Sequence, residues 1–207
     1  MSFGYKSLLS YQLSKIAFDL GWEFVPLYFI GSEFGRQRDQ IYQDLRSHKQ
    51  NIVEGSAERS LSSKLKLYDV SKSSGQEALE DFEDMLRFEN LPRWNKNDPR
   101  LAKLRAVIEG YSPSRPSYPS NPSLPQKATI AAVLKALGKE GNRQIRRGEG
   151  QEEAEIIANY IIDVLIRAGY VLDRQIDAVE KKHEQEGGYN ENLLKKRLAY
   201  RSKSFSF

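Results

Sequence analysis

The longest helical pattern in the chain spans residues 60–89, which read SLSSKLKLYDVSKSSGQEALEDFEDMLRFE. Side chains on one face of a helix recur every three or four positions. Such a row runs through this segment, with apolar residues at both ends and small ones in the centre: Leu61, Leu65, Tyr68, Ser71, Gly75, Ala78, Phe82 and Met85. The small residues would let a neighbouring helix approach closely, so the segment predicts a long helix packed against others.

Three other segments have the same spacing, at residues 5–30, 36–58 and 152–186. Gly21 and Pro26 predict a bend or break in the first, because proline removes a helix hydrogen bond. The last spans roughly 45 Å at ~1.5 Å per residue, close to the length of the helix over 60–89, which favours side-by-side packing. The apolar rows are Leu9, Leu13, Ile16 and Leu20; Ile41, Leu45, His48 and Ile52; and Ile157, Ile161, Val164, Ala168, Leu172, Gln175 and Val179.

Residues 91–150 separate the first three helices (1–90) from the fourth helix and tail (151–207). Asp98 followed by Pro99 predicts a short helix to about Glu109, and residues 127–137 predict another. A glycine-rich basic loop is expected over residues 138–150. Prolines recur at every third residue, the period of polyproline II, so this stretch is a stiff spacer or a docking motif for a peptide-binding domain: Pro113, Pro116, Pro119, Pro122 and Pro125.

The net charge of +4 is unevenly distributed. Residues 1–90 carry −3, residues 91–150 carry +8 and residues 151–207 carry −1. The tail nevertheless contains a cluster without acidic neighbours: Lys195, Lys196, Arg197, Arg201 and Lys203. Two basic zones beside a nearly neutral or acidic body indicate a polyanionic partner.

Composition excludes several classes of protein. The 207 residues include no cysteine, which excludes disulfide scaffolds, thiolate zinc sites and cysteine nucleophiles. No apolar run approaches the ~20 residues of a membrane span, and the N-terminus has no signal-peptide core. The expected location is the cytoplasm.

Candidate catalytic groups are few. The acids at residues 77–84 could belong to a carboxylate-bridged di-metal bundle, but that chemistry needs Glu-x-x-His pairs, which neither His48 nor His183 forms. These acids are therefore interpreted as a solvated face, and His48 as a satisfied core or interface residue. The glycines of 138–150 lack the Gly-Lys-Ser/Thr ending of a phosphate-binding loop. The sequence predicts no enzyme, no metal and no cofactor.

One polar corner lies between the second and third predicted helices. It contains the run Asn51-Ile52-Val53-Glu54-Gly55, followed by Arg59-Ser60, with Arg46 before it and Glu77 after it. This pattern resembles the four-helix bundle proteins encoded in ribosomal RNA intervening sequences and the accessory protein of diversity-generating retroelements, where Ala replaces Val53. The corner is predicted to be mainly structural, with Asn51 and Glu54 capping the helix or bridging to Arg59 or a neighbouring chain.

The C-terminal part resembles the suffix domain that extends a subset of these bundle proteins. The matching elements are Ala158-Asn159, Leu172-Asp173-Arg174-Gln175, Glu186-Gly187-Gly188-Tyr189, Arg197 and Arg201. The family resemblance implies an all-α, antiparallel up-down four-helix bundle, assembly as a homopentamer and, in the retroelement branch, binding to nucleic acid and a reverse transcriptase. It implies no catalytic activity. The basic insert between the third and fourth helices departs from the compact family pattern.

Self-association is also expected from the residues themselves. Ser71, Gly75 and Ala78 form a small-residue row, and the aromatics Trp22, Tyr28 and Phe29 exceed what one bundle core absorbs.

Two functions remain open. In the first, the protein binds RNA or DNA, most plausibly structured RNA, through phosphate contacts, with the last four tail cations able to share one side of a short helix and Tyr200 stacking on a base. The predicted contacts are Lys139, Arg143, Arg146, Arg147, Lys195, Lys196, Arg197, Tyr200, Arg201 and Lys203. In the second, the chain is an oligomeric scaffold for a protein partner, with the polyproline stretch as the docking element.

Overall fold

The computed structural model describes residues 4–110, 127–139 and 150–204. Four long helices account for most of them: α1 (Leu9–Tyr28), α2 (Gly35–Ala57), α3 (Leu61–Phe88) and α6 (Gln151–Glu186). The shorter helices are α4 (Pro99–Glu109), α5 (Ile130–Ala136) and α7 (Tyr189–Ser204), with 3-10 turns at Gly4–Ser7 and Ser32–Phe34. These described ranges contain no strand, which confirms the all-α class.

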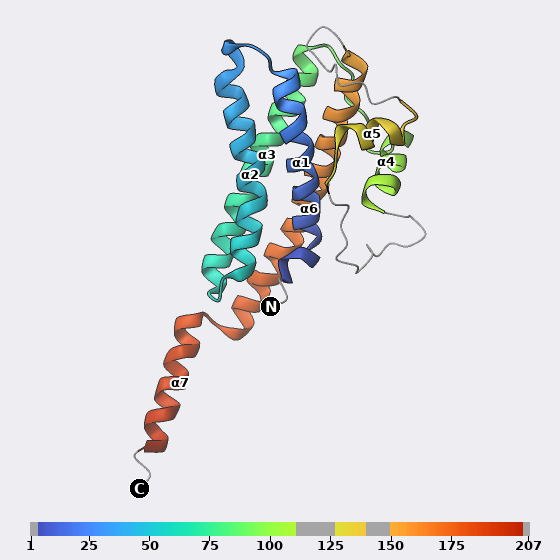
Figure 1. Ribbon diagram of the computed structural model, residues 1–207. Helices are drawn as coiled ribbons and strands as arrows, with labels where there is room; N and C mark the ends of the chain where they lie inside the picture. Colours follow the sequence, from blue (N-terminus) through green and yellow to red (C-terminus); the bar gives the residue numbers. More distant parts are fainter. Residues whose placement is uncertain (1–3, 111–126, 140–149, 205–207) are drawn as a thin grey trace.

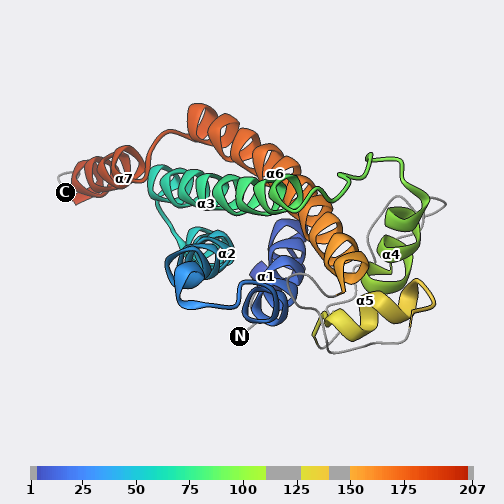
Figure 2. The ribbon, with the colours of Figure 1, turned by 90° about the horizontal axis from the view of Figure 1, so that it is seen from above.

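The long helices lie side by side (Figures 1 and 2). α1 packs against α2 and α6, and α3 packs against the same two helices. All four fall within a few residues of the predicted segments. Ser60 caps α3 as predicted, because its hydroxyl accepts a hydrogen bond from the Ser63 amide at 3.4 Å.

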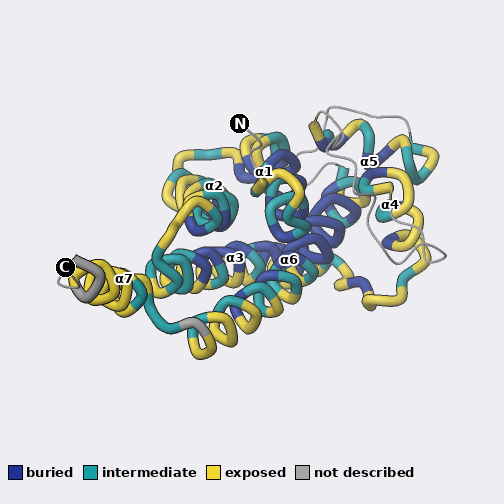
Figure 3. The backbone as a smooth tube through the Cα atoms, turned by 90° about the horizontal axis from the view of Figure 1, so that it is seen from below, coloured by how far each residue is buried: buried dark blue, intermediate teal, exposed yellow. Residues whose placement is uncertain are grey.

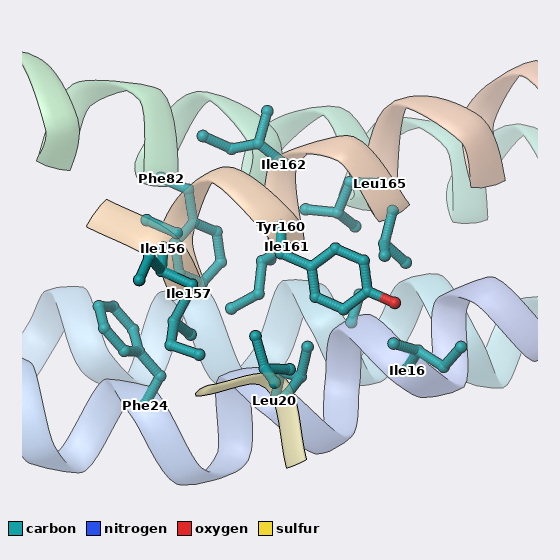
Figure 4. Packing of buried hydrophobic residues seen from close by; sticks show 14 of the residues in the cluster. Ile16, Leu20, Phe24, Phe82, Ile156, Ile157, Tyr160, Ile161, Ile162 and Leu165 are labelled. Carbon is teal, nitrogen blue, oxygen red and sulfur yellow. The ribbon is translucent and has the colours of Figure 1, made fainter. Parts of the chain in front are cut away.

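The main core lies between α1, α3 and α6 (Figure 4). Leu20 and Phe24 of α1 meet Phe82 of α3, and the isoleucines of α6 fill the space between them. A second, smaller cluster near the opposite end joins Ile52, Tyr68, Leu172 and Ile176. Burial of these side chains supplies the principal stabilisation of the fold, at roughly 1.5–3 kcal/mol for each large aliphatic or aromatic group.

α1 is continuous through both Gly21 and Pro26, so the predicted break is wrong. Pro26 lies in the last turn of the helix, where few backbone bonds remain to be disrupted. The proline cannot donate to the carbonyl of Trp22, and that carbonyl instead accepts a hydrogen bond from the Tyr42 hydroxyl of α2 at 3.4 Å. A bond between helices thus replaces the bond that proline removes.

The aromatic residues expected to drive self-association differ in exposure. Trp22 is 55% exposed, whereas Tyr28 and Phe29 are 2% and 5% exposed. The last two were wrongly expected on the surface, because the insert between the third and fourth long helices adds apolar side chains to the same core. These are Leu101, Leu104, Ile108, Ala128, Ile130, Val133 and Leu134.

The insert follows the predicted starts. Asp98 caps α4 by accepting from the Arg100 amide at 2.9 Å, and Thr129 caps α5 by accepting from the Ala132 amide at 3.1 Å. Both helices lie beside α1 and α6 (Figure 2). Over the described residues, no helix is long and apolar enough to cross a membrane.

Candidate nucleic-acid interface

α7 extends away from the rest of the protein (Figure 1). It starts after Gly187, whose φ of +74° lies in the region that favours glycine, and its first turn is held by Glu191, which accepts from the Gly188 amide at 3.2 Å. Figure 3 shows the helix as almost wholly exposed, and Tyr200 is 75% exposed. The Tyr200 ring is therefore accessible for stacking on a base.

The cations of α7 surround the helix. Successive residues of an α-helix differ by about 100°, so Lys195 and Arg197 point about 200° apart. The expectation that these residues share one side with Lys196 and Arg201 is therefore not met. Lys196 and Tyr200 do lie one turn apart on a common face.

These side chains are also free of ion pairs within the described chain. Lys195, Lys196, Arg197 and Arg201 are exposed, and none pairs with an acid among the described residues. Lys203 belongs to α7, but its side chain lies outside the described part. The helix has no acidic residue after Glu191, so its positive charge stands unneutralised.

The described cations of the insert behave differently. Arg93 pairs with Glu83 of α3 at 3.0 Å, and Lys127 pairs with Glu23 of α1 at 2.7 Å. Arg100 stacks over the Trp94 ring, with its guanidinium carbon 3.6 Å from the ring centroid, and also approaches Glu155 of α6 at 3.3 Å. The excess charge of this segment is partly consumed in attaching it to the long helices.

A buried network completes this attachment. Arg105 of α4 pairs with Asp163 of α6, which also accepts from Arg167 Nε at 2.9 Å. Arg167 donates to Glu109 at 2.6 Å, and the Tyr160 hydroxyl donates to the same carboxylate at 3.0 Å. Burial, followed by the charge of Glu109, raises the pKa of Tyr160 well above its usual value, so Tyr160 remains protonated.

Asn159, part of the C-terminal resemblance, ties the start of the insert to α6. Its carboxamide oxygen accepts from the Trp94 amide at 2.7 Å, and its nitrogen donates to the Pro92 carbonyl at 2.9 Å. The residue is fully buried. It therefore satisfies backbone groups that would otherwise lack partners.

The remaining predicted phosphate contacts are divided. Lys139 pairs with Glu152 of α6, so its charge is partly neutralised. Arg143, Arg146 and Arg147 lie outside the described residues, as does the polyproline stretch over residues 111–126. The structure therefore brings together only the α7 members of the predicted set.

The polar corner is structural in part. Asn51 donates from Nδ2 to the Ser47 carbonyl and hydroxyl, both at 2.9 Å. A Cβ on Gly55 would lie 2.7 Å from the Tyr68 ring of α3. Gly55 thus permits the close approach of α2 and α3 at this end of the molecule.

The charged members of the corner point to solvent. Arg46, Glu54 and Arg59 are exposed, and neither Glu54 nor Arg59 forms a hydrogen bond or ion pair with another described residue. The predicted bridge from Glu54 to Arg59 is absent from the described chain, because α2 ends at Ala57 and its last turn leaves both side chains on the surface. Asn51 bonds within α2 instead of to Arg59.

Acidic side chains gather where α2 meets α3, in a cavity of about 410 Å³ that Asp44, Glu77 and Asp81 help to line. Burial raises the pKa of Asp81 to about 6, and the charge of Asp44 adds to the rise. Glu77 accepts only from the Ser73 hydroxyl, at 3.4 Å. No cluster of histidine and acidic residues in the described chain is arranged to hold a metal ion.

Comparisons with family models, characterised proteins and solved structures find no match to this chain. The case for function therefore comes from the residues and their geometry.

Proposed function

We propose that this chain is a non-enzymatic accessory protein that binds RNA or DNA, chiefly structured RNA, through α7. The observation that carries the proposal is a contrast between two sets of cations. Those of α4, α5 and their flanks pair with acids of the long helices, whereas Lys195, Lys196, Arg197 and Arg201 have no ionic partner among the described residues.

Phosphates are the expected targets of these free charges. Lysine and arginine side chains that neutralise phosphates release condensed counterions, which gives affinity with little base selectivity and a steep salt dependence. Because the cations surround a projecting helix, α7 can contact phosphates on both sides of a groove or at a bend. Tyr200 adds a ring on which an unpaired base can stack. Lys139 and the three loop arginines, Arg143, Arg146 and Arg147, would extend the contact surface.

The family assignment belongs to the same proposal. We infer that the four long helices constitute an antiparallel up-down four-helix bundle of the intervening-sequence and retroelement-accessory type, with the suffix at α7. That assignment implies a cytoplasmic homo-oligomer, with a pentamer as the expected number, and a reverse transcriptase as a possible partner. Its residue support is the corner at Asn51 and Gly55 together with Asn159.

The test is binding of a fluorescent hairpin RNA at several salt concentrations. A triple variant, Lys195→Gln, Lys196→Gln and Arg197→Gln, is compared with a control of equal charge loss, Arg36→Gln, Lys66→Gln and Lys103→Gln. Glutamine is a good helix former, so neither variant should disturb its helix. Loss of three phosphate contacts should lower the log–log salt slope by about 2 to 3 units.

The control variant removes the same charge from exposed positions on α2, α3 and α4. It should retain the affinity and slope of the wild type apart from a small uniform change. Equal losses in both variants would mean that net charge alone governs binding, and unchanged binding in the α7 variant would refute the proposal.

A protein partner is the second candidate. Leu194 and Leu198 are 58% and 56% exposed and lie one turn apart on α7. Exposed leucines at this spacing can enter an apolar groove of another protein. In that case binding would be insensitive to the three glutamine substitutions and would be lost on replacing Leu194 and Leu198 by Ser.

A further inference from the structure

His48 of α2 is buried against α3 in an unusual way. Its Nδ1 lies 2.8 Å from the Ser71 carbonyl oxygen, and the Ser71 hydroxyl donates to the His48 carbonyl at 2.6 Å. A Cβ on Gly75 would lie 2.8 Å from the same ring nitrogen. The imidazole is therefore held by Ser71 and seated over the bare backbone of Gly75.

This geometry fixes the tautomer. A carbonyl oxygen only accepts, so Nδ1 carries the proton and donates to Ser71. Burial lowers the pKa of His48, which keeps the ring neutral at pH 7. The lone pair then resides on Nε2, and Nε2 is buried without a hydrogen-bond partner among the described residues. A buried acceptor of this kind is normally satisfied by protein, water or ligand.

His48 also lines an open cavity of about 280 Å³ between α3 and α6. Apolar groups and two glycines form much of its wall: Gly75, Leu79, Leu165, Ile166 and Gly169. The polar part of the lining includes Gln76 and the ion pair of Lys72 Nζ with Asp173, whose atoms are 2.6 Å apart. Tyr170, which is 61% exposed, contributes an aromatic ring.

We propose that this cavity binds a nucleobase that carries an exocyclic amine, with the amine donating to Nε2 of His48. The apolar wall suits the faces of a flat heterocycle, and Tyr170 offers a stacking surface. Lys72 and Gln76 can donate to ring nitrogens, while Asp173 can accept from a sugar hydroxyl. The base can come from a free nucleoside or from an unpaired position in a strand, and in the second case the proposal rests on the nucleic-acid function.

Other ligands fit the same lining less well. An anion would meet the lone pair of His48 and the carboxylate of Asp173, both of which repel negative charge. A metal ion would find no cluster of histidine and acidic side chains among the described residues. A purely apolar ligand would leave Nε2 unsatisfied, as it is in the empty cavity.

The first test compares adenosine with purine riboside, which differs only by lacking the amine. Calorimetry should show adenosine binding roughly tenfold more tightly, the ratio expected for one hydrogen bond to a buried neutral acceptor. The chain has only two histidines, so nitrogen-15 NMR resolves both imidazoles. Saturation with adenosine should shift His48 Nε2 and leave His183, at the end of α6, unchanged.

A cavity-filling variant provides the structural control. A Cβ on Gly169 would meet no atom within 4 Å, so Gly169→Leu should fold normally and extend its side chain into the cavity. It should weaken adenosine binding at least tenfold. Ala178→Leu, at an exposed position of the same helix outside the cavity lining, should have no effect.

The source of the base is distinguished by a third arm with a hairpin RNA bearing one unpaired adenosine. Competition between this RNA and adenosine, lost in Gly169→Leu, identifies a strand base; adenosine binding without competition identifies a free nucleoside. Equal affinity for adenosine and purine riboside, no binding of adenosine at millimolar concentration, or an unmoved Nε2 resonance would each overturn the proposal. RNA binding that depends on α7 salt contacts would survive all three outcomes.

Discussion

Replacing Gly75 by alanine tests the close approach of α2 and α3 at His48. The new Cβ would lie 2.8 Å from His48 Nδ1, 2.9 Å from Cε1 and 3.2 Å from Cγ, whereas ordinary contacts begin near 3.4 Å. The ring cannot easily retreat, because it is 1% exposed and bonded to Ser71. Overpacking of a rigid core costs about 1–3 kcal/mol, and alanine recovers about 0.5–1 kcal/mol in a helix. We expect a net loss of about 1–2 kcal/mol.

Gly169→Ala is the matched control, because Gly169 also lies inside a long helix but has open space at its Cβ position. It should stabilise the protein by about 0.5–1 kcal/mol. Urea unfolding followed by circular dichroism measures both changes, provided that the m-value stays constant. A double variant with His48→Ala should remove the clash, so that Gly75→Ala becomes neutral or stabilising in that background.

The reasoning fails if Gly75→Ala stabilises the protein as much as Gly169→Ala. That result would mean that α2 and α3 separate at little cost. The small-residue row of α3 would then have no role in holding the two helices close.

The other predictions concern charge, a buried amide and the glycine-rich loop. The folded-state pKa of Asp81 is raised to about 6, so its unfavourable contribution grows as pH rises from about 4 to 6; Asp81→Asn should therefore raise the urea midpoint more at pH 7.5 than at pH 4.5. Asn159→Leu should lower unfolding free energy by about 2 kcal/mol or more, since it strands buried backbone groups at Pro92 and Trp94. RNA affinity should fall for all sequences alike, and the salt slope should flatten by about one unit per contact, on changing to glutamine the loop residues Arg143, Arg146 and Arg147.

The helices were predictable because each carries a local signal. The row through Ser71, Gly75 and Ala78 of α3 is buried as predicted, and the starts at Ser60 and Asp98 coincide with observed caps. Periodicity and capping depend on residues a few positions apart, so they can be read without knowledge of the fold. The continuity of α1 was not predictable in this way, since Tyr42 of another helix satisfies the carbonyl left by Pro26.

The candidate site was predictable only where exposure follows from sequence. The tail cations have no acids nearby in the chain, and they lie on an exposed helix. The insert cations looked equally free, yet Arg105 meets Asp163, 58 residues later in the chain, and Lys127 meets Glu23, 104 residues earlier. Net charge over a segment cannot reveal such pairs.

His48 illustrates a different gap. Its place on an apolar helical row predicted burial, which is confirmed, and predicted that its polar atoms would be satisfied, which holds for Nδ1 alone. Whether the second nitrogen finds a partner depends on side chains of α3 and α6 that meet only in three dimensions.

The position of the insert also restricts how copies of the chain can meet. α4 and α5 cover the side of the molecule formed by α1 and α6 (Figure 2). A closed ring requires each subunit to present two different, complementary patches, and a patch on this side would require the insert to detach, breaking the buried pair of Arg105 with Asp163. Neighbours must therefore approach over α2, α3 or the groove between α3 and α6. Any contact on that groove would hide His48, so ring closure and occupation of the cavity would compete.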